Sequence, residues 1–208
     1  DIKLKTAYKK LMIQVLFWII PLMLLLIIVA KPLFNLIIGP KWLPAVPYFQ
    51  ILCVAAIVYP LHVYNLNIIN VKGRSDLFLR LEIIKKVLGI TMIAFSVIFG
   101  MIGLLVAQVI FSFLAVYINT YYSGKMINYP FKEQLMDIWP MFLIGLFSVG
   151  ISFFVSRFLL QNHFLPDFIL ILLVSVCFFV TYLGISYITK LTAITDFIEL
   201  ISKKTAIK

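Results

Sequence analysis

Long apolar runs, separated by short charged or Gly- and Pro-containing breaks, dominate this chain. These runs approach the roughly 20 residues that a helix needs to cross a hydrocarbon core about 30 Å thick. The pattern therefore predicts an all-α, polytopic membrane helix bundle formed by residues 1–189. The six expected transmembrane helices are 11–30, 46–70, 77–99, 104–122, 138–158 and 168–188. Residues 190–208 are too polar to span, but their apolar positions recur at helical spacing, which predicts an amphipathic tail on the cytoplasmic surface.

The breaks between the expected helices differ in composition. Residues 31–47 are rich in Pro and Gly and contain Trp42, which predicts an interfacial loop with an aromatic anchor in place of a continuous helix. Ser75 or Asp76 is expected to cap the third helix, because a short polar side chain can accept bonds from the free amides of a first turn. Gly100 and Gly103 mark a charge-free break, so the third and fourth helices are expected to form a hairpin.

Composition supports a membrane protein and argues against other classes. Hydrophobic residues make up 63% of the chain and charged residues 12%, which would leave a soluble domain with too much exposed apolar surface. The net charge of +10 could suggest a nucleic-acid partner, but the basic residues gather at the ends of apolar runs and not on one polar face. We therefore expect no nucleic acid, and interpret the basic residues as topology signals and contacts to membrane lipid.

The distribution of basic residues predicts the orientation. Five of the eighteen Lys and Arg residues lie in the charged segment 71–86, which interrupts two strongly apolar segments. In the six-helix layout, fifteen of the eighteen fall on one side, and only Lys31, Lys41 and Arg157 on the other. Because cytoplasmic loops of membrane proteins carry an excess of Lys and Arg, both ends of the chain are expected to be cytoplasmic.

No enzyme constellation is present in the sequence. The two histidines, His62 and His163, are expected at different depths, so a metal site made by this chain alone is not predicted. The chain also lacks a Gly-rich phosphate loop and a clustered carboxylate pair within a span. We therefore expect neither catalysis nor a cofactor. Because the chain begins at Asp1 without an initiator Met, we expect it to be a piece of a longer protein.

The second expected helix carries the most polar residues. Tyr59, His62 and Asn65 follow one another at three-residue intervals, and Tyr64, Asn67 and Asn70 do the same on an adjacent strip. Polar side chains in hydrocarbon usually face a bundle interior or a water-filled cavity. Two interpretations remain open: Tyr59, His62, Asn65 and Asn67 could line a substrate pathway, or they could hydrogen-bond to neighbouring helices and hold the bundle together.

The charged segment after this helix also allows two interpretations. Arg74, Arg80, Lys85 and Lys86 could hold a lipid-linked pyrophosphate at the inner leaflet, because cations at a headgroup interface attract phosphate. The same residues are equally expected from the positive-inside pattern alone.

Part of the sequence resembles a known family. Pro32-Leu-Phe-Asn-Leu-Ile-Ile-Gly39-Pro-Lys-Trp42 and the following segment to Leu52, then Tyr59-Pro60-Leu61, Asn65-Leu-Asn67 and Lys72-Gly73-Arg74-Ser75-Asp76, resemble the bacterial oligosaccharide flippases of the Wzx type. These belong to the multidrug/oligosaccharidyl-lipid/polysaccharide exporter superfamily. Residues 32–86 carry the resemblance best, and beyond them only the hydropathy rhythm agrees.

The resemblance implies a fold and an activity. Members of this family have two helical lobes with a cavity between them, and this chain is similar to the C-terminal lobe, so the N-terminal lobe would be its partner. The implied activity is movement of an undecaprenyl-pyrophosphate-linked oligosaccharide across the bacterial inner membrane, for O-antigen, capsule or exopolysaccharide synthesis. Two alternatives remain: a drug or ion exporter of the same superfamily, and a membrane-embedded polysaccharide polymerase or glycosyltransferase.

Overall fold

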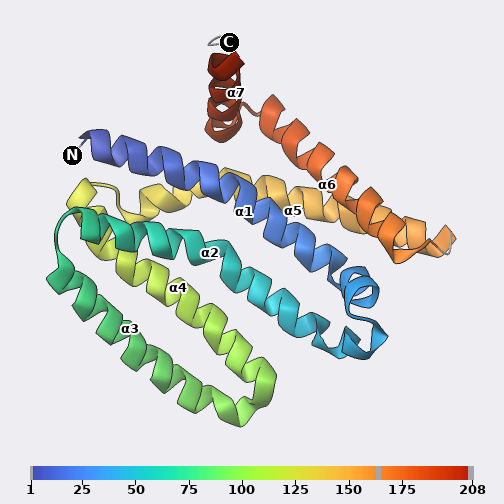
Figure 1. The fold of residues 1–208 in the computed structure, drawn as a ribbon, viewed down its shortest axis with the longest axis horizontal. Helices are drawn as coiled ribbons and strands as arrows, with labels where there is room; N and C mark the ends of the chain where they lie inside the picture. Colours follow the sequence, from blue (N-terminus) through green and yellow to red (C-terminus); the bar gives the residue numbers. More distant parts are fainter. Residues whose placement is uncertain (1, 163–164, 206–208) are drawn as a thin grey trace. The chain divides into compact units, whose positions relative to one another are not determined.

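The chain is built from long helices (Figure 1). This computed structural model describes residues 2–162 and 165–205, with side chains described over 2–159 and 165–198. Two short 3-10 helices, η1 (Pro40–Ala45) and η2 (Val97–Phe99), connect longer elements. The α-helices are α1 (Ile2–Ile37), α2 (Val46–Val71), α3 (Ser75–Ser96), α4 (Gly100–Ile127), α5 (Phe131–Asn162), α6 (Asp167–Ile188) and α7 (Thr192–Thr205).

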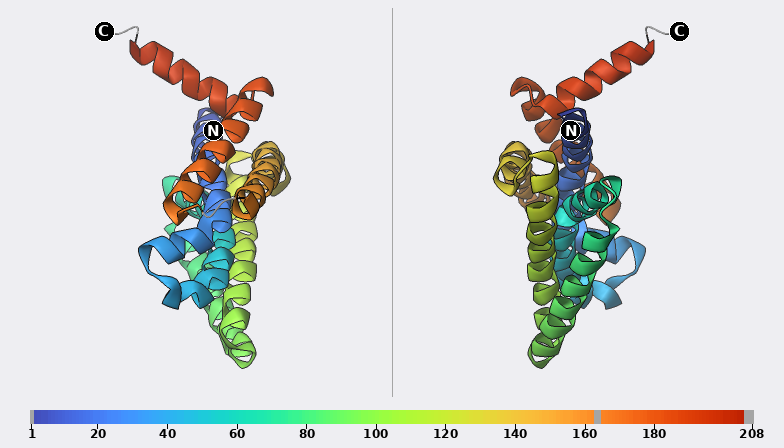
Figure 2. Two further views of the ribbon diagram at one scale, coloured as in Figure 1. Left: turned by 90° about the vertical axis from the view of Figure 1, so that its right-hand side faces the viewer. Right: turned by 90° about the vertical axis from the view of Figure 1, so that its left-hand side faces the viewer.

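Most of these helices have the length and composition of membrane spans. Among the described residues, five stretches qualify: Ile2–Ile37, Pro40–Val71, Ser75–Ile127, Phe131–Leu159 and Asp167–Ile188. The stretch Ser75–Ile127 contains both α3 and α4, which lie side by side (Figures 1 and 2). The turn between them ends at Gly100, whose φ of 68° is readily adopted only by glycine. The predicted hairpin and the all-α membrane bundle are therefore confirmed.

Two expectations about helix ends are wrong. The interfacial loop expected over 31–47 begins later, because α1 continues through Pro32 to Ile37 and η1 fills most of the remainder. Proline is tolerated in membrane helices, where neighbouring groups satisfy the carbonyl that it leaves free. Neither Ser75 nor Asp76 caps α3, since Arg74 occupies the N-cap position without a side-chain cap bond. The Asp76 carboxylate instead accepts two hydrogen bonds from the Arg74 guanidinium.

The chain divides into two compact units that share α1 and α5. The first unit contains the start of α1 up to Met12 together with Pro47–Asp137. The second contains Ile13–Val46 and the chain from Ile138 onward. Each unit is therefore assembled from segments that are far apart in the sequence.

The polar ends of the first unit lie together. Figure 1 shows the first turns of α1, the α2–α3 connection and the α4–α5 connection at one end of this unit, and η2 at the other. Lys5 joins two of these segments, because its ammonium donates to the Asn128 carbonyl at 2.7 Å and pairs with Glu133 at 3.1 Å. The three basic clusters of this unit, which were predicted to share one side of the membrane, thus share one end of the unit. Which side of the membrane that end faces stays a prediction.

In the second unit, α5 packs against α1 through small residues. A Cβ built on Gly145 would lie 2.7 Å from Leu24 Cδ1 and 3.6 Å from Ile20 Cγ2 of α1. Ser148 and Ser152, on the same side of α5, are fully buried. Small side chains allow helices to approach closely, which matters in lipid because no hydrophobic effect drives helices together there.

The C-terminal segment is helical, as the sequence predicted. Over its described side chains, α7 contacts α1: the Gln14 amide donates to the Ala193 carbonyl at 2.7 Å, and the rings of Trp18 and Phe197 meet edge to face. Ala193 and Ile194 are buried. The expected tail includes residues 206–208, which lie outside the described residues, and its position on a membrane surface stays a prediction.

Candidate functional site: a polar pocket on α2 and α4

The candidate site is a small pocket in the first unit. It has a volume of about 120 Å³ and is lined by Val58, Tyr59, His62, Gln108, Phe111, Ser112 and Ala115. Tyr59 and His62 lie on one face of α2 because residues three apart on a helix are neighbours, and Gln108 and Ser112 are likewise neighbours on α4. Four side chains with polar groups thus converge in helices that are otherwise strongly apolar.

Asn119 of α4 fixes the state of the His62 ring. Its amide nitrogen lies 3.2 Å from the His62 carbonyl oxygen and 3.1 Å from His62 Nδ1. Only the nitrogen of the amide can sit beside the carbonyl, because two carbonyl oxygens would repel each other. Asn119 therefore donates to Nδ1, and in the neutral imidazole the proton resides on Nε2. His62 can offer that Nε2–H group to a hydroxyl or phosphate oxygen.

Two other predicted pathway residues on α2 are exposed at the surface of the bundle. Tyr59 is 64% exposed and its ring stacks on that of His62. Asn67 is exposed and does not line this pocket. The structure thus brings Tyr59 and His62 together, but it does not add Asn67 to them.

Asn65 has a different role from its neighbours. It is fully buried, and its amide oxygen accepts hydrogen bonds from Ser123 Oγ at 2.6 Å and Gln134 Nε2 at 3.2 Å. Its amide nitrogen donates to the Leu61 carbonyl at 2.9 Å and Gln134 Oε1 at 3.0 Å. Because both ends of the amide are satisfied inside the protein, the structure favours helix joining over pathway lining for this residue.

Sequence reasoning missed an ionic cluster beside this network. Lys5 pairs with Glu133 at 3.1 Å and Lys9 with Asp137 at 2.7 Å. The buried Tyr129 hydroxyl donates to Asp137, and both ammonium groups lie within 5.6 Å of the Tyr129 ring centre. Burial and the bond to Asp137 raise the pKa of Tyr129. The sequence did hold a signal: Lys5 and Lys9 are four residues apart, as are Glu133 and Asp137. This spacing places each pair on one face of its helix, so that two helices side by side can form both ion pairs.

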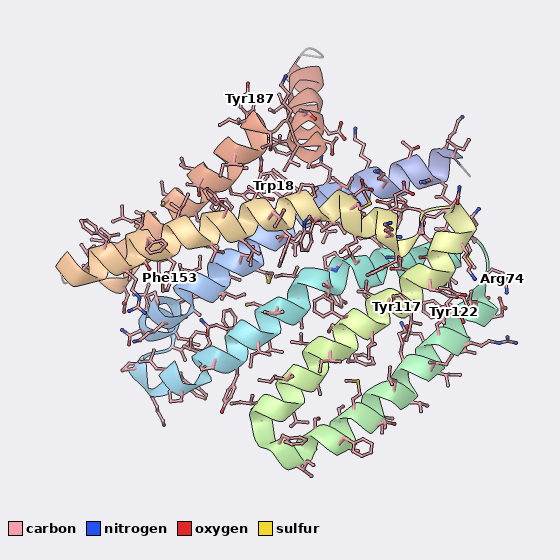
Figure 3. All side chains as sticks on the ribbon, turned by 180° about the vertical axis from the view of Figure 1, so that it is seen from behind. Trp18, Arg74, Tyr117, Tyr122, Phe153 and Tyr187 are labelled. Atoms are coloured by element: carbon pink, nitrogen blue, oxygen red, sulfur yellow. The ribbon has the colours of Figure 1, made fainter. Side chains whose placement is uncertain are left out.

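The four basic residues after α2 do not form one cluster. Arg74 (Figure 3), Arg80 and Lys86 are exposed, whereas Lys85 is only 3% exposed and is paired with Glu82. Hydrogen bonding to Asp76 raises the pKa of the Arg74 guanidinium. The Asp76 carboxylate pairs with Arg74, and the Glu82 carboxylate pairs with Lys85. Arg80 and Lys86 are exposed and could meet a phosphate, whereas the Arg74 guanidinium and the Lys85 ammonium are already paired with carboxylates.

The described residues contain no group of three His, Cys, Asp or Glu side chains placed to hold a metal ion. His163, the second histidine of the sequence, lies outside the described residues.

Comparisons with known proteins give one relative. An uncharacterized membrane protein in the cps region of Klebsiella pneumoniae is 26% identical over 152 residues, which cover 66% of this chain and 31% of the relative. The match therefore spans about a third of that protein's length. No family model matches the chain, and no solved structure is detectably similar to it. The resemblance to Wzx-type flippases stays a prediction.

Proposed function

We propose that this chain is part of a transporter that moves a lipid-linked oligosaccharide across the bacterial inner membrane. The observation that carries the proposal is the similarity to a membrane protein in a cps region, which we take to denote capsular polysaccharide synthesis. The six helices would form one wall of the pathway, and a further lobe of the same protein would form the other. The activity, the carrier lipid and that second lobe are all part of the proposal.

The chemistry of the pocket on α2 and α4 fits such a substrate. A sugar headgroup cannot enter hydrocarbon without losing the hydrogen bonds that water gives it. The His62 Nε2–H group, the Tyr59 hydroxyl and the Gln108 amide could replace some of these bonds. The aromatic face of Tyr59, exposed and stacked on His62, adds an apolar surface for a sugar ring. In this proposal His62, Tyr59 and Gln108 contact substrate, and Asn65 holds the helices that position them.

The test is export in living cells. The full-length gene would be deleted from its host, and surface polysaccharide and intracellular lipid-linked oligosaccharide would both be measured. We expect surface polysaccharide to fall and the lipid-linked precursor to accumulate. Normal surface polysaccharide in the deletion strain would contradict the proposal.

Complementation then tests the pocket. His62→Ala and Gln108→Ala are expected to restore about a fifth or less of wild-type export at unchanged protein abundance, because loss of one hydrogen bond to substrate costs about 1–3 kcal/mol. Asn70→Ala is the matched control, since Asn70 is exposed on the same helix and does not line the pocket. Equal export by all three variants would remove the pocket from the proposal.

A further inference from the structure

A second, larger pocket lies at the α4–α5 connection, away from the site described above. Its volume is about 450 Å³, within the usual range for small-molecule sites. All of its lining residues belong to the first unit, at the end that carries the basic clusters. They are Tyr117, Thr120, Tyr121, Gly124, Lys125, Asn128, Pro130, Phe131 and Lys132.

The connection that forms this pocket is held in a defined shape. Asn128 ends α4 in the left-handed conformation, and the Gly124 carbonyl accepts the Tyr129 amide at 2.8 Å. A side chain at position 124 would place its Cβ only 2.7 Å from the Tyr129 carbonyl oxygen, so glycine is required there. Tyr129 is fully buried, and its hydroxyl bond to Asp137 fixes the connection to α5. The pocket is therefore preformed.

The polar groups of the pocket suit an anion that carries phosphate. Lys125 and Lys132 are both exposed, and Lys125 Nζ lies 2.7 Å from the Tyr121 hydroxyl and 4.1 Å from its ring centre. Phe131 and Lys132 also form the first turn of α5, whose free amides favour negative charge. Two ammonium groups beside a helix N-terminus are a strong combination for phosphate oxygens.

Thr120 gives independent support for a ligand. It is 0% exposed and lines the pocket, yet its hydroxyl has no hydrogen-bond partner among the described residues. A buried hydroxyl without a partner is destabilising, because it has lost its hydrogen bonds to water and gained none in the protein. A threonine in a helix normally satisfies its hydroxyl by bonding to the carbonyl one turn earlier. After a small shift of the side chains that cover it, the Thr120 hydroxyl could bond to a phosphate or sugar oxygen in the pocket.

An apolar recess adjoins this pocket and points to a lipid in place of a free anion. It has a volume of about 350 Å³ and is lined by Leu81 and Ile84 of α3 and by Tyr117, Ile118, Tyr121 and Tyr122 of α4. Tyr117 and Tyr121 line both cavities. Figure 3 labels Tyr117 and Tyr122 on α4, beside α3. A pocket that carries two lysines and a recess lined by aliphatic and tyrosine side chains, with two tyrosines in common, match the two halves of an amphiphile.

We infer that the α4–α5 pocket binds the phosphate headgroup of a lipid, with the start of the lipid chain in the neighbouring recess. This inference rests on the proposed function only for the identity of the lipid. The phosphate could belong to a polyprenyl carrier of the transported glycan or to a bulk anionic phospholipid. Binding of the carrier would give the transporter a loading site at this end of the first unit.

Binding to the purified full-length protein tests the inference. Native mass spectrometry in detergent would measure the affinity for undecaprenyl phosphate, for phosphatidylglycerol and for uncharged undecaprenol. We expect both phosphate lipids to bind more tightly than undecaprenol. The double variant Lys125→Gln/Lys132→Gln should weaken phosphate-lipid binding about tenfold or more, since hydrogen bonds to charged groups are stronger than those between neutral groups.

The control is charge-matched. Lys3→Gln/Lys10→Gln removes two exposed cations from the start of α1 and should leave binding within twofold of wild type. Thr120→Val, which keeps the shape of the side chain, should weaken phosphate-lipid binding, whereas Thr120→Ser should retain it. Because both lysines are exposed, the double variant is expected to keep its melting temperature, so a loss of binding can be separated from misfolding.

The outcomes separate the two lipid sources. A preference for undecaprenyl phosphate that disappears in the double variant supports a carrier site, and equal losses for both phosphate lipids support a general anionic-lipid site. Unchanged binding in the double variant, or equal losses in the charge-matched control, would overturn the inference. Failure of the proposed function would instead appear as normal export in the deletion strain, whatever the lipid affinity.

Discussion

Ser123 Oγ donates a 2.6 Å hydrogen bond to Asn65 Oδ1, and both side chains are completely buried. This bond joins α2 to α4, and Gln134 extends the same network to the start of α5. Gln134 also donates to the Tyr129 carbonyl at 3.0 Å, which links the network to the α4–α5 connection. Asn65, a polar residue in an apolar helix, thus fixes the positions of α2, α4 and α5 relative to one another.

The first prediction concerns this network. Asn65→Ala should reduce the free energy of unfolding by about 1–3 kcal/mol, because the Ser123 hydroxyl and the Gln134 amide oxygen would be left buried without a partner. Thermal unfolding in detergent measures the change, with Asn70→Ala as the exposed control on the same helix. Export by Asn65→Ala should fall only as far as protein abundance falls. Reduced export at normal abundance would return Asn65 to the substrate pathway.

The second prediction concerns the contact between α5 and α1. Gly145→Leu should reduce stability by about 1–3 kcal/mol, since extra methylenes in a packed contact force neighbouring chains apart. The position offers little room because an added Cβ would already lie 2.7 Å from Leu24 Cδ1. Leu146→Ile, at an exposed position on the same helix, should have little effect on the melting temperature. Equal melting of the two variants would contradict close packing at Gly145.

The third prediction separates two adjacent lysines. Lys85→Met should cost about 2 kcal/mol, between the values typical of exposed and fully buried ion pairs, because Glu82 keeps a partly shielded charge without its partner. Lys86→Met removes the same charge from an exposed position and should cost much less. Chemical or thermal unfolding of the two variants side by side provides the measurement. A loss of stability for Lys85→Met that is no larger than the loss for Lys86→Met would contradict a stabilising Lys85–Glu82 pair.

The fourth prediction concerns membrane orientation. In a background with Cys53→Ala and Cys177→Ala, new cysteines at Lys72 and Lys125 should resist a thiol reagent that cannot cross the inner membrane. A cysteine at Asn162 should react, because the basic-residue distribution predicts this connection on the opposite side. The reverse labelling pattern would overturn the predicted orientation.

Helix positions could be predicted from the sequence more fully than helix ends. The apolar runs alone indicate six spans, and the glycine at position 100 correctly marks the α3–α4 turn. Pro32 was misleading, because the rules for proline derive from water-exposed helices and are weaker in lipid. Ser75 and Asp76 have the composition of caps, but a neighbouring arginine competes for the Asp76 carboxylate.

The candidate site was less predictable for a different reason. Polarity within a span singles out His62 and Asn65, but it cannot show which one meets a cavity and which one meets another side chain. Their roles depend on contacts with Gln108, Asn119, Ser123 and Gln134. These four residues are too far from α2 in the sequence for a local pattern to predict the contacts. The second pocket could not be predicted, because the distribution of basic residues identifies Lys125 and Lys132 only as topology signals.

The central claim is that the full-length protein moves a lipid-linked oligosaccharide between leaflets. Its most direct test is reconstitution of the purified full-length protein in proteoliposomes that contain a fluorescent undecaprenyl-pyrophosphate-linked sugar, with a membrane-impermeant quencher added outside. Our account predicts that the quenchable fraction rises with time in protein-containing vesicles, and rises more slowly with His62→Ala. A quenchable fraction that stays at the level of protein-free vesicles would contradict it.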